Sequence, residues 1–566
     1  MLIFWSNIIA AGQQELKFTL KPVFDGNQLY FRIDLKFRGE ADGTTNLILP
    51  NRWGGQPKLY QGIKNLTTSS PNAKISDTDE PHIKIITHRP NQILQIRYEL
   101  VQDFTGNLRG EIRYRPALQR DFFHLIGHGI WVLPQWNETE PISISLDWEK
   151  IPKSWTLAGS FGVNKLHQRF DTTLEGFIHS IFVGGNFRLK SDSIKGKPVN
   201  VAIRGKWKFT DEEFADLVRR IIRIERDFWK DYDAPYYLVT LTSLEAPPDV
   251  SFSAGTGLTN SFALFYTDDA RLDNFKGLLA HEYFHNWNSL KLGRLVEPIQ
   301  GMFWFSEGFT DYYAYLLLLR SGLISLDEYL QRYNRFIREY YLSPVREAEN
   351  RKVIQDFWND DDMHDLPYRR GFLLATNWNA LIRNASGGKN SLDDVMLDLF
   401  KDAKADKPEI TQELIDRYVS RYAGRSILPD IRQYVENGKL IVPDKDAFGS
   451  YVQMELVEER LFEPGLDLET LVTKKIIAGV KEDSTAYLAG LRDGQTVVRR
   501  LPIYVGDATK PIEITIKDGE SEKTIKYFPA SRKTFGIPQY KLKSGITEKE
   551  RAEVLQMLGN ALTKQL

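Results

Sequence analysis

The hydrophobic period of the chain changes twice, and these changes divide it into three regions. From Leu16 to about Arg204 apolar and polar residues alternate, as in the run LYFRIDLKF at 29–37, and turn signals such as Asp25-Gly26 separate the runs. A period of two is typical of β-strands that bury one face. The pattern predicts an N-terminal all-β domain, built as a sandwich or as paired sheets.

From Thr210 the period becomes helical. Thr210 and Glu213 have the spacing of a capping box, and apolar residues follow them at intervals of three and four. A strand-like run at 236–241 comes next, and helical patterns then dominate from Asp273 to about Tyr434. This region is predicted to be a mainly helical domain with a small sheet near its start.

Strand patterns return after about Tyr451, and the segment from Ser484 to Gly494 looks like the short helix and glycine turn of a PDZ domain. Residues Thr547 to Leu566 predict a terminal amphipathic helix. The predicted fold class is therefore multidomain α+β. We expect a β domain at 13–205, a helical domain at 206–450, a PDZ-like domain at 451–540 and a C-terminal helix at 541–566.

Residues 1–12 allow two interpretations. Leu2 to Ala11 is mostly apolar and ends in small residues, which resembles a signal-peptide core with its cleavage site, yet no Lys or Arg precedes it. The alternative is a first β-strand. We favour a periplasmic or secreted location over a cytoplasmic one. No apolar segment of the sequence is long enough to predict a transmembrane helix.

Charge and cysteine content exclude several partners and reaction types. The 74 basic and 75 acidic residues nearly cancel, and no basic run marks a nucleic-acid surface, so nucleic acid is not an expected partner. The sequence has no cysteine. Disulfides and thiol catalysis are thereby excluded, and any metal must be held by His, Asp or Glu.

The run HEYFH at 281–285 carries the most informative chemistry. On a helix, His281 and His285 lie one turn apart on the same face and can converge on one metal ion. Glu282 lies beside the first histidine, where its carboxylate can reach a metal-bound water. The run therefore predicts one Zn²⁺ ion on the two histidines.

A third protein ligand is expected, because catalytic zinc usually has three. Glu307 follows His285 by 22 residues and precedes the apolar run 316–319, so it begins a buried helix in which an unpaired carboxylate would be costly. Zinc would be its partner. Asp311 lies one turn further on and could accept a ring N–H from a ligating histidine.

Other histidines and tyrosines fit simpler interpretations. His124 and His128 are also four residues apart, but their surroundings are strand-rich, and on a strand such residues are about 13 Å apart and cannot share one zinc. His364, in the acidic stretch 360–365, is interpreted as solvated surface. Three tyrosines after Glu307 are interpreted as packing residues: Tyr312, Tyr313 and Tyr315.

Two motifs resemble a known family. The runs HEYFHNWN at 281–288 and WFSEGFTDYY at 304–313 look like the glycyl aminopeptidase family of zinc metallopeptidases, and the resemblance extends to a Tyr-x-x-Gly segment at 368–371. That family belongs to the gluzincins. The resemblance implies a thermolysin-like catalytic domain between an N-terminal β domain and a C-terminal PDZ domain.

The resemblance also implies roles for individual residues. His281, His285 and Glu307 would ligate zinc, and Glu282 would be the general base that takes a proton from the zinc-bound water. Tyr368 would donate a hydrogen bond to the developing oxyanion. The alternative for Tyr368, which lies beside two arginines, is a structural surface residue.

One stretch departs from the family pattern. Relatives carry a Gly-Gly-Leu-Glu-His-like stretch on the strand edge where substrate lies, and a glutamate in this region pairs with the substrate amine in related aminopeptidases. The matching residues here are Gly257, Leu258, Thr259 and Asn260, which we predict to bind substrate. Thr259 cannot supply the negative charge. Glu245 could substitute, but nothing in the sequence places it there.

The sequence therefore predicts a zinc metallopeptidase that acts on a peptide or protein, and it leaves aminopeptidase and endopeptidase activity both open. The alternative is a catalytically impaired adaptor that binds peptides through its groove and PDZ-like domain. The intact HEYFH run and Glu307 favour the enzyme, and the altered Thr259-Asn260 favours the adaptor. A third interpretation is another zinc-dependent hydrolysis, such as epoxide opening. The oligomeric state is not predicted.

Overall fold

The computed structural model describes residues 14–26, 28–247 and 250–559, and within them the chain forms two compact units. The first unit ends at Tyr283 and the second begins at Phe284. The stretch at 1–12, interpreted as a signal remnant or a first strand, lies outside the described residues.

Strands with alternating burial build the N-terminal part of the first unit. In β1 (Glu15–Asp25) and β2 (Gln28–Arg38) nearly every second residue is buried, and Phe18 lies opposite Leu35 in their antiparallel pair. The other strands of this part are β3 (Thr44–Ile48), β4 (Ile63–Thr68), β5 (Lys74–Asp77), β6 (Ile83–Thr87), β7 (Ile93–Leu100), β8 (Ala117–Gln119), β9 (Phe122–Ile126), β10 (Leu133–Pro134), β11 (Pro141–Trp148), β12 (Thr156–Gly159), β13 (Gly162–Val163), β14 (His167–Thr173) and β15 (Ile181–Gly185).

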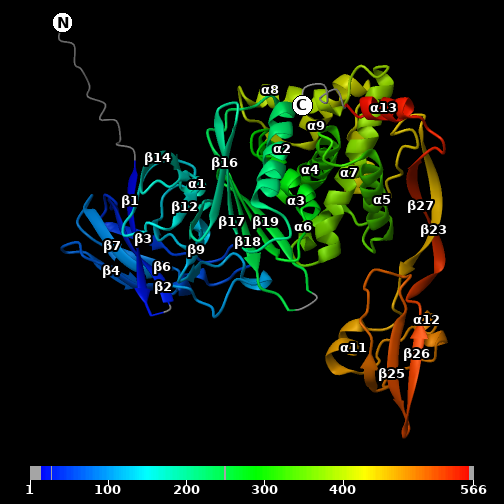
Figure 1. Cartoon of the computed structure of the whole chain (residues 1–566), viewed down its shortest axis with the longest axis horizontal. Coiled ribbons are helices and arrows are strands. Elements are labelled where there is room, and N and C mark those ends of the chain that lie inside the picture. Colours follow the sequence, from blue (N-terminus) through cyan, green and yellow to red (C-terminus); the bar gives the residue numbers. More distant parts are fainter. Residues whose placement is uncertain (1–13, 27, 248–249, 560–566) are drawn as a thin grey trace. The chain divides into compact units, whose positions relative to one another are not determined.

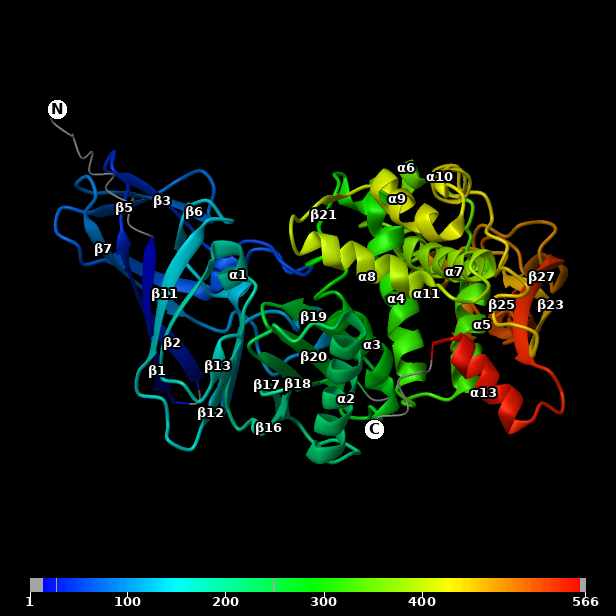
Figure 2. The same ribbon diagram turned by 90° about the horizontal axis from the view of Figure 1, so that it is seen from above.

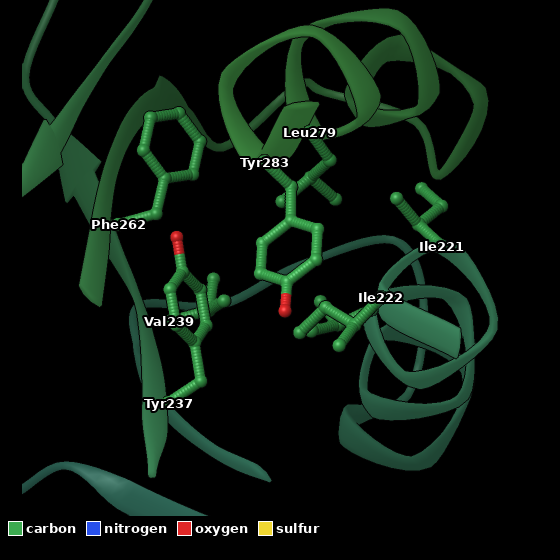
Figure 3. Close-up of a pocket in the computed structure, with 8 residues that line it drawn as sticks. Ile221, Ile222, Tyr237, Val239, Phe262, Leu279 and Tyr283 are labelled. Atoms are coloured by element: carbon green, nitrogen blue, oxygen red, sulfur yellow. The ribbon is translucent and has the colours of Figure 1, made fainter. Parts of the chain in front are cut away.

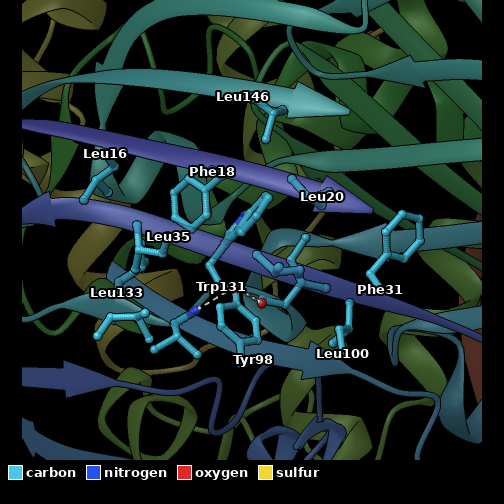
Figure 4. Packing of buried hydrophobic residues seen from close by; sticks show 14 of the residues in the cluster. Leu16, Phe18, Leu20, Phe31, Leu35, Tyr98, Leu100, Trp131, Leu133 and Leu146 are labelled. Carbon is cyan, nitrogen blue, oxygen red and sulfur yellow. Dashed lines mark hydrogen bonds between the residues drawn. The ribbon is translucent and has the colours of Figure 1, made fainter. Parts of the chain in front are cut away.

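These strands form two sheets that share one core. The larger sheet runs β13-β12-β15-β9-β8-β2-β1-β11-β14, with β7 beside β2 and β4 beside β7, and the smaller runs β10-β3-β6-β5. Phe18 packs on Trp131 with ring centroids 4.7 Å apart, and the hydroxyl of buried Tyr98 donates to the carbonyl of Ile130 at 3.1 Å (Figure 4). The predicted N-terminal β domain is confirmed.

A second kind of sheet follows in the same unit. Its strands are β16 (Arg188–Ile194), β17 (Lys197–Arg204), β18 (Tyr237–Leu244), β19 (Ser253–Leu258) and β20 (Ser261–Thr267), in the order β16-β17-β18-β20-β19. β17, β18 and β20 are parallel, whereas β19 runs antiparallel to β20 at the edge. The hydrophobic period alone assigns β16 and β17 to the N-terminal β domain, but they belong to this second sheet. The period identifies a strand but does not show which strand it pairs with.

Two helices pack beside this β16–β20 sheet (Figure 1, Figure 2). α2 (Asp211–Trp229) begins with the predicted capping box, in which the Thr210 hydroxyl accepts from the backbone N–H of Glu213 and the Glu213 carboxylate accepts from that of Thr210. α3 (Asp273–Phe284) follows β20. A short helix, α1 (Leu174–Ile178), lies between β14 and β15 in the chain.

The first part of the second unit is mainly helical. Its helices are α4 (Phe303–Arg320), α5 (Leu326–Leu342), α6 (Asn350–Asp356), α7 (Asp361–Ala385), α8 (Leu392–Ala403), α9 (Gln412–Ala423) and α10 (Leu428–Asp430), and the short strands β21 (Arg294–Leu295) and β22 (Glu409–Ile410) pair with each other. Nearly all of α4 is buried, including Asp311 and Arg320. Its sequence is apolar all round, as expected for a helix enclosed by others.

The C-terminal part of this unit has its own small core. β23 (Val452–Phe462) pairs with β27 (Ala530–Leu542), and β24 (Val497–Arg500), β25 (Ile512–Asp518) and β26 (Ser521–Tyr527) form a further sheet (Figure 1). α11 (Leu468–Lys474) and the predicted short helix, α12 (Thr485–Leu488), contribute Leu471 and Ala486 to the core. We call residues 451–542 the C-terminal module.

The last helix that the structure describes is α13 (Glu548–Met557), and Thr547 and Glu550 form a capping box at its start. The predicted continuation of this helix to Leu566 falls partly outside the described residues. Among the helices that the structure describes, none combines the length and apolar character that a membrane crossing needs. The chain is thus multidomain α+β, with an N-terminal β domain and a helical C-terminal region, as predicted.

Candidate active site

One face of α3 packs against apolar side chains of α2 and of the β16–β20 sheet. Leu279 and Tyr283 of α3 face Ile221 and Ile222 of α2 and Tyr237 of β18 around a small apolar cavity (Figure 3). The hydroxyl of Tyr283 accepts a hydrogen bond from Nε of buried Arg226 at 2.8 Å. Because one face of the helix is held in this way, the direction in which its histidines project is set by the surrounding structure.

The structure brings the three predicted metal ligands together. One ligand atom from each of His281, His285 and Glu307 lies within 4.8 Å of the other two. His281 is in the last turn of α3, His285 follows the end of that helix, and Glu307 lies near the start of α4. The two histidines lie close together because of their spacing of four residues at the end of a helix. Glu307 joins them because of where α4 lies.

Hydrogen bonding sets the orientation of His285. Its Nδ1 donates to the main-chain carbonyl of Asn288 at 2.6 Å, since a carbonyl can only accept. In the neutral ring Nε2 then carries the lone pair, and it lies 3.2 Å from Oε2 of Glu307. The side chains of His285 and Glu307 are 23% and 16% exposed, so the pair is largely shielded from water.

The donor set suits a zinc ion. Two imidazoles and one carboxylate make up a common catalytic zinc site, which keeps a fourth position for water or substrate. Three such groups within 4.8 Å of one another, two of them mostly buried, match that donor set. Within the described residues this is the group of His, Asp and Glu side chains that could hold a metal.

A close helix crossing positions the segment with Tyr368. A β-carbon on Gly371 of α7 would lie 1.6 Å from the carbonyl oxygen of Trp304, and one on Gly308 of α4 would lie 2.4 Å from the Gly371 Cα. Only glycine permits this approach. Glu307 adjoins Gly308 and Tyr368 precedes Gly371 by about one turn, so both lie near the crossing.

The ring of Tyr368 is held by its own helix. It stacks on His364, with centroids 5.6 Å apart, and His364 stacks on Phe357 at 4.5 Å. His364 is thus half-buried rather than the solvated surface residue that its acidic stretch suggested, because neighbouring aromatic rings cover it. Buried Tyr312 and Tyr313 are packing residues, as predicted.

Two further acidic side chains are buried. Asp311 is 8% exposed and lies 3.8 Å from Nη1 of Arg369. Glu225 of α2 is fully buried, and neither carboxyl oxygen has a hydrogen-bond partner in the described part of the chain. Burial raises the pKa of Glu225 well above its usual value, and the nearby charge of His281 acts in the opposite direction. Sequence reasoning missed Glu225, which looks like an ordinary helix residue.

The edge strand β19 lies against Glu282. A β-carbon on Gly257 would be 3.6 Å from Oε2 of Glu282. The hydroxyl of Tyr114 donates to the carbonyl of Gly255 at 2.9 Å. Burial raises the pKa of Tyr114, Arg113 opposes that rise, and the charge of Glu282 adds a smaller upward shift. Sequence reasoning missed Tyr114, because it comes from the β domain and belongs to no motif.

The residues after Gly257 face other partners. Leu258 is buried, and Asn260 adopts a positive φ of 51° in the turn to β20. The hydroxyl of Thr259 donates to the carbonyl of Gly176 at 2.7 Å, and its N–H donates to that of His179 at 2.6 Å. Glu245 accepts from the side chain of Asn107 and is exposed.

Comparison with known proteins agrees with this geometry. Residues 274–361 match the family model described as M61 glycyl aminopeptidase. The chain is similar in structure to an aminopeptidase N family protein from Idiomarina loihiensis, with 15% identity and a TM-score of 0.72 over 96% of this chain and 100% of that one. At this identity the likeness shows the fold alone.

A weaker structural likeness is to an M1 zinc metallopeptidase from Deinococcus radiodurans. It has 15% identity over 76% of this chain and 94% of that chain, and its TM-score of 0.46 is too low to say more about the fold. No curated protein matches the sequence.

The family match supports a peptidase. His281, Glu282, His285 and Glu307 all lie within the segment that matches the M61 glycyl aminopeptidase family model. The family predicted from the sequence is thereby confirmed over these residues, and so is the prediction that the chain is a peptidase.

Proposed function

We propose that the chain is a zinc-dependent peptidase that hydrolyses peptide bonds with one zinc ion held by His281, His285 and Glu307. The observation that carries this proposal is the convergence of their ligand atoms within 4.8 Å. The preset tautomer of His285, whose Nδ1 is occupied by the Asn288 carbonyl, supports it further. A thermolysin-like, gluzincin catalytic domain at 206–450 is the arrangement that these features favour.

A bound zinc ion would supply a Lewis acid that polarises the scissile carbonyl and makes the attacking water more acidic. Glu282 would take the proton from that water and deliver it to the leaving amine. The proximity of Glu282 to Gly257 supports this role, because it places the carboxylate beside the strand edge on which a peptide can lie. No covalent intermediate is needed.

The substrate backbone would extend β19. An edge strand has unpaired N–H and C=O groups, and an extended peptide can pair with them. Gly257 leaves the space above Glu282 open, since it has no side chain. Tyr368 would donate a hydrogen bond to the oxyanion as it forms, and its place near the crossing of α4 and α7 is the basis for this assignment. Asp311 would hold the other ring nitrogen of a ligating histidine.

We infer that cleavage does not require a free amino terminus on the substrate. A free ammonium needs a negatively charged partner, and the hydroxyl of Thr259 is committed to the carbonyl of Gly176. Glu245, which the sequence left as a substitute, accepts from Asn107 instead. Gly257 and Leu258 would therefore contact substrate through their main chain, and endopeptidase activity is favoured over aminopeptidase activity.

The C-terminal module is proposed to be a PDZ-like domain with a structural role. Its short helix α12 and following glycine turn support the PDZ assignment. The side chain of Asn334 on α5 makes two hydrogen bonds of 2.7 Å with the main chain of Tyr540 on β27. Arg338 of α5 forms an ion pair of 2.7 Å with Glu459 of β23. These contacts favour a fixed support over a free peptide-binding module.

Zinc analysis coupled to peptide cleavage tests the proposal. Purified protein should contain about one zinc ion per chain, and it should cleave matched peptides with free and N-acetylated termini at similar kcat/KM. Cleavage of free termini alone would establish an aminopeptidase and refute the inference from Thr259. Absence of zinc after reconstitution, together with absence of cleavage, would refute the enzyme and leave the peptide-binding adaptor, which the altered Thr259-Asn260 stretch alone favours.

A further inference from the structure

Asn288 connects to the candidate metal centre through its main chain. The residue is completely buried, and its carbonyl oxygen accepts the hydrogen bond from Nδ1 of His285 at 2.6 Å. This bond selects the tautomer of His285 in which Nε2 carries the lone pair. Nε2 is the nitrogen that faces Glu307, at 3.2 Å from its Oε2. The main chain of Asn288 therefore decides which nitrogen of His285 is offered as a ligand.

Asn288 also connects to the metal centre through its side chain. Its Nδ2 lies 3.2 Å from the carbonyl of Phe305, 3.1 Å from that of Ser306 and 3.2 Å from Oγ1 of Thr310. These groups surround Glu307 in the first turns of α4. The two hydrogens of the amide are shared among the three acceptors. The reverse orientation would place Oδ1 against carbonyl oxygens, so the amide can lie only one way.

The remaining atom of this amide is costly to the fold. In the residues that the structure describes, the buried Oδ1 of Asn288 has no hydrogen-bond partner. An unpaired buried acceptor reduces stability, and an apolar side chain of similar size would avoid that cost. A need for stability alone therefore does not explain an asparagine here, whereas a need to hold α4 in register with His285 does.

We propose that Asn288 is a positioning residue that presets the distance and orientation between His285 and Glu307 before the metal binds. The inference rests on the proposed zinc site and adds a residue to it. Groups behind metal ligands raise affinity because the ligands need not reorganise on binding. Asn288 combines two such contacts in one residue, one to each ligand-bearing segment.

Zinc affinity of the full-length variant Asn288→Ala is the direct test. Kd would be measured by competition with a chromophoric chelator, which needs no substrate, and the visible spectrum of the cobalt-substituted protein would report the ligand geometry. The variant keeps the main-chain carbonyl but loses the link to α4. We expect zinc Kd to rise about 10–100-fold, with an altered cobalt spectrum and a fall in kcat larger than any change in KM.

Asn350→Ala is the matched control. Asn350 is also a buried asparagine, 5% exposed, and its Nδ2 donates to the carbonyl of Gly301 at 3.1 Å and to Glu436 at 3.2 Å. This variant should lower the thermal midpoint of the metal-free protein while zinc Kd and the cobalt spectrum stay unchanged. Equal loss of zinc affinity in both variants would show that Asn288 acts only through general stability and would overturn the proposal.

A milder variant covers the case in which Asn288→Ala does not fold. Thr310→Val removes one of the three acceptors and leaves Asn288 in place, so zinc Kd should rise about 2–10-fold, the worth of one hydrogen bond. Unchanged affinity in every folded variant, while the unaltered protein binds zinc, would refute the role of Asn288 alone. Failure of the unaltered protein to bind zinc would instead refute the proposed function.

Discussion

Two pairs of histidines in this chain share the same spacing but lie in different structures. His281 and His285 lie at the end of α3 and converge with Glu307 within 4.8 Å. His124 lies within β9, and His128 lies in the turn that follows. Neither ring nitrogen of His124 has a partner in the described part of the chain, and His128 stacks on Trp53 with centroids 4.6 Å apart.

The two pairs also differ in charge. Burial lowers the pKa of His124 and of His128 to about 3, so both are neutral packing residues at neutral pH. The difference between the pairs teaches that a spacing of four acquires its meaning from the backbone. On a helix the two rings stand one turn apart on one face, and along strands and turns they separate.

The largest contrast should come from removing one histidine of each pair. His281→Ala should raise zinc Kd by more than about 100-fold and abolish cleavage, because losing a ligand should exceed the 10–100-fold cost of an outer contact. His124→Leu should leave zinc binding unchanged. Chelator competition measures both. Loss of zinc binding in His124→Leu would contradict the interpretation of His124 as a packing residue.

Glu282→Gln separates the chemistry of the helical pair from its metal binding. Glutamine keeps the shape of the side chain but cannot accept the proton, so kcat should fall about 10²–10⁴-fold. Zinc content should stay the same, since Glu282 is not a proposed ligand. The measurements are steady-state kinetics and elemental analysis, and full activity in this variant would contradict the role of general base.

Gly371→Ala tests how the third ligand reaches the helical pair. The added methyl would meet the carbonyl of Trp304 at 1.6 Å, so the crossing of α4 and α7 must open, at a cost of about 3 kcal/mol or more. Gly536→Ala is the control, because its nearest neighbour, at 3.3 Å, is the flexible end of Glu458. Thermal unfolding and zinc Kd would be compared, and equal behaviour of the two variants would contradict the assigned role of the crossing.

Burial of His124 should make the stability of the protein depend on pH. The folded pKa of His124 is about 3, below the usual 6.5, so between these values the unfolded chain binds a proton that the folded chain excludes. Stability is therefore present above pH 6.5 and lost as pH falls toward 3. At pH 4.5 the loss should be about 2–3 kcal/mol relative to pH 7.5.

His124→Leu should remove this part of the pH dependence. The measurement is the unfolding free energy of the variant and of the unaltered protein in urea at both pH values. His167→Gln serves as a control, because the side chain of His167 is 78% exposed. An identical pH dependence in His124→Leu and the unaltered protein would show that His124 is not held neutral by burial.

The smallest effect is expected for Thr259, in the turn after β19, which contacts His179 beside His128. His179, whose carbonyl accepts from Thr259, packs its ring against His128 at 4.3 Å. Thr259→Val removes the hydrogen bond to Gly176 and should cost about 0.5–1.5 kcal/mol of stability. Cleavage of N-acetylated peptides should change less than twofold, roughly, since the hydroxyl is not proposed to touch substrate. A large selective loss of cleavage would place Thr259 in the substrate site.

The sequence predicted the parts of the site that depend on local periodicity. The HEYFH run and the capping box of α2 each need only a few neighbouring residues to interpret. Tyr114 and Glu225 could not be predicted, because they approach Glu282 and His281 through the packing of segments far apart in sequence. Asn288 was visible as part of a motif, but its two contacts depend on where α4 lies. The partner of β17 depends on sheet assembly in the same way.

The link between α4 and the end of the chain has a consequence for synthesis on the ribosome. Nε of Arg320, the last residue of α4, donates to the carbonyl of Leu558 at 2.7 Å, and Arg320 is 5% exposed. The helix that brings Glu307 to the histidines thus acquires this buried contact only after residue 558 has left the exit tunnel. The first unit ends at Tyr283, so its chain is synthesised much earlier, and N-terminal domains generally fold first. Nascent chains released before that point should hold the two histidines but a less stable α4.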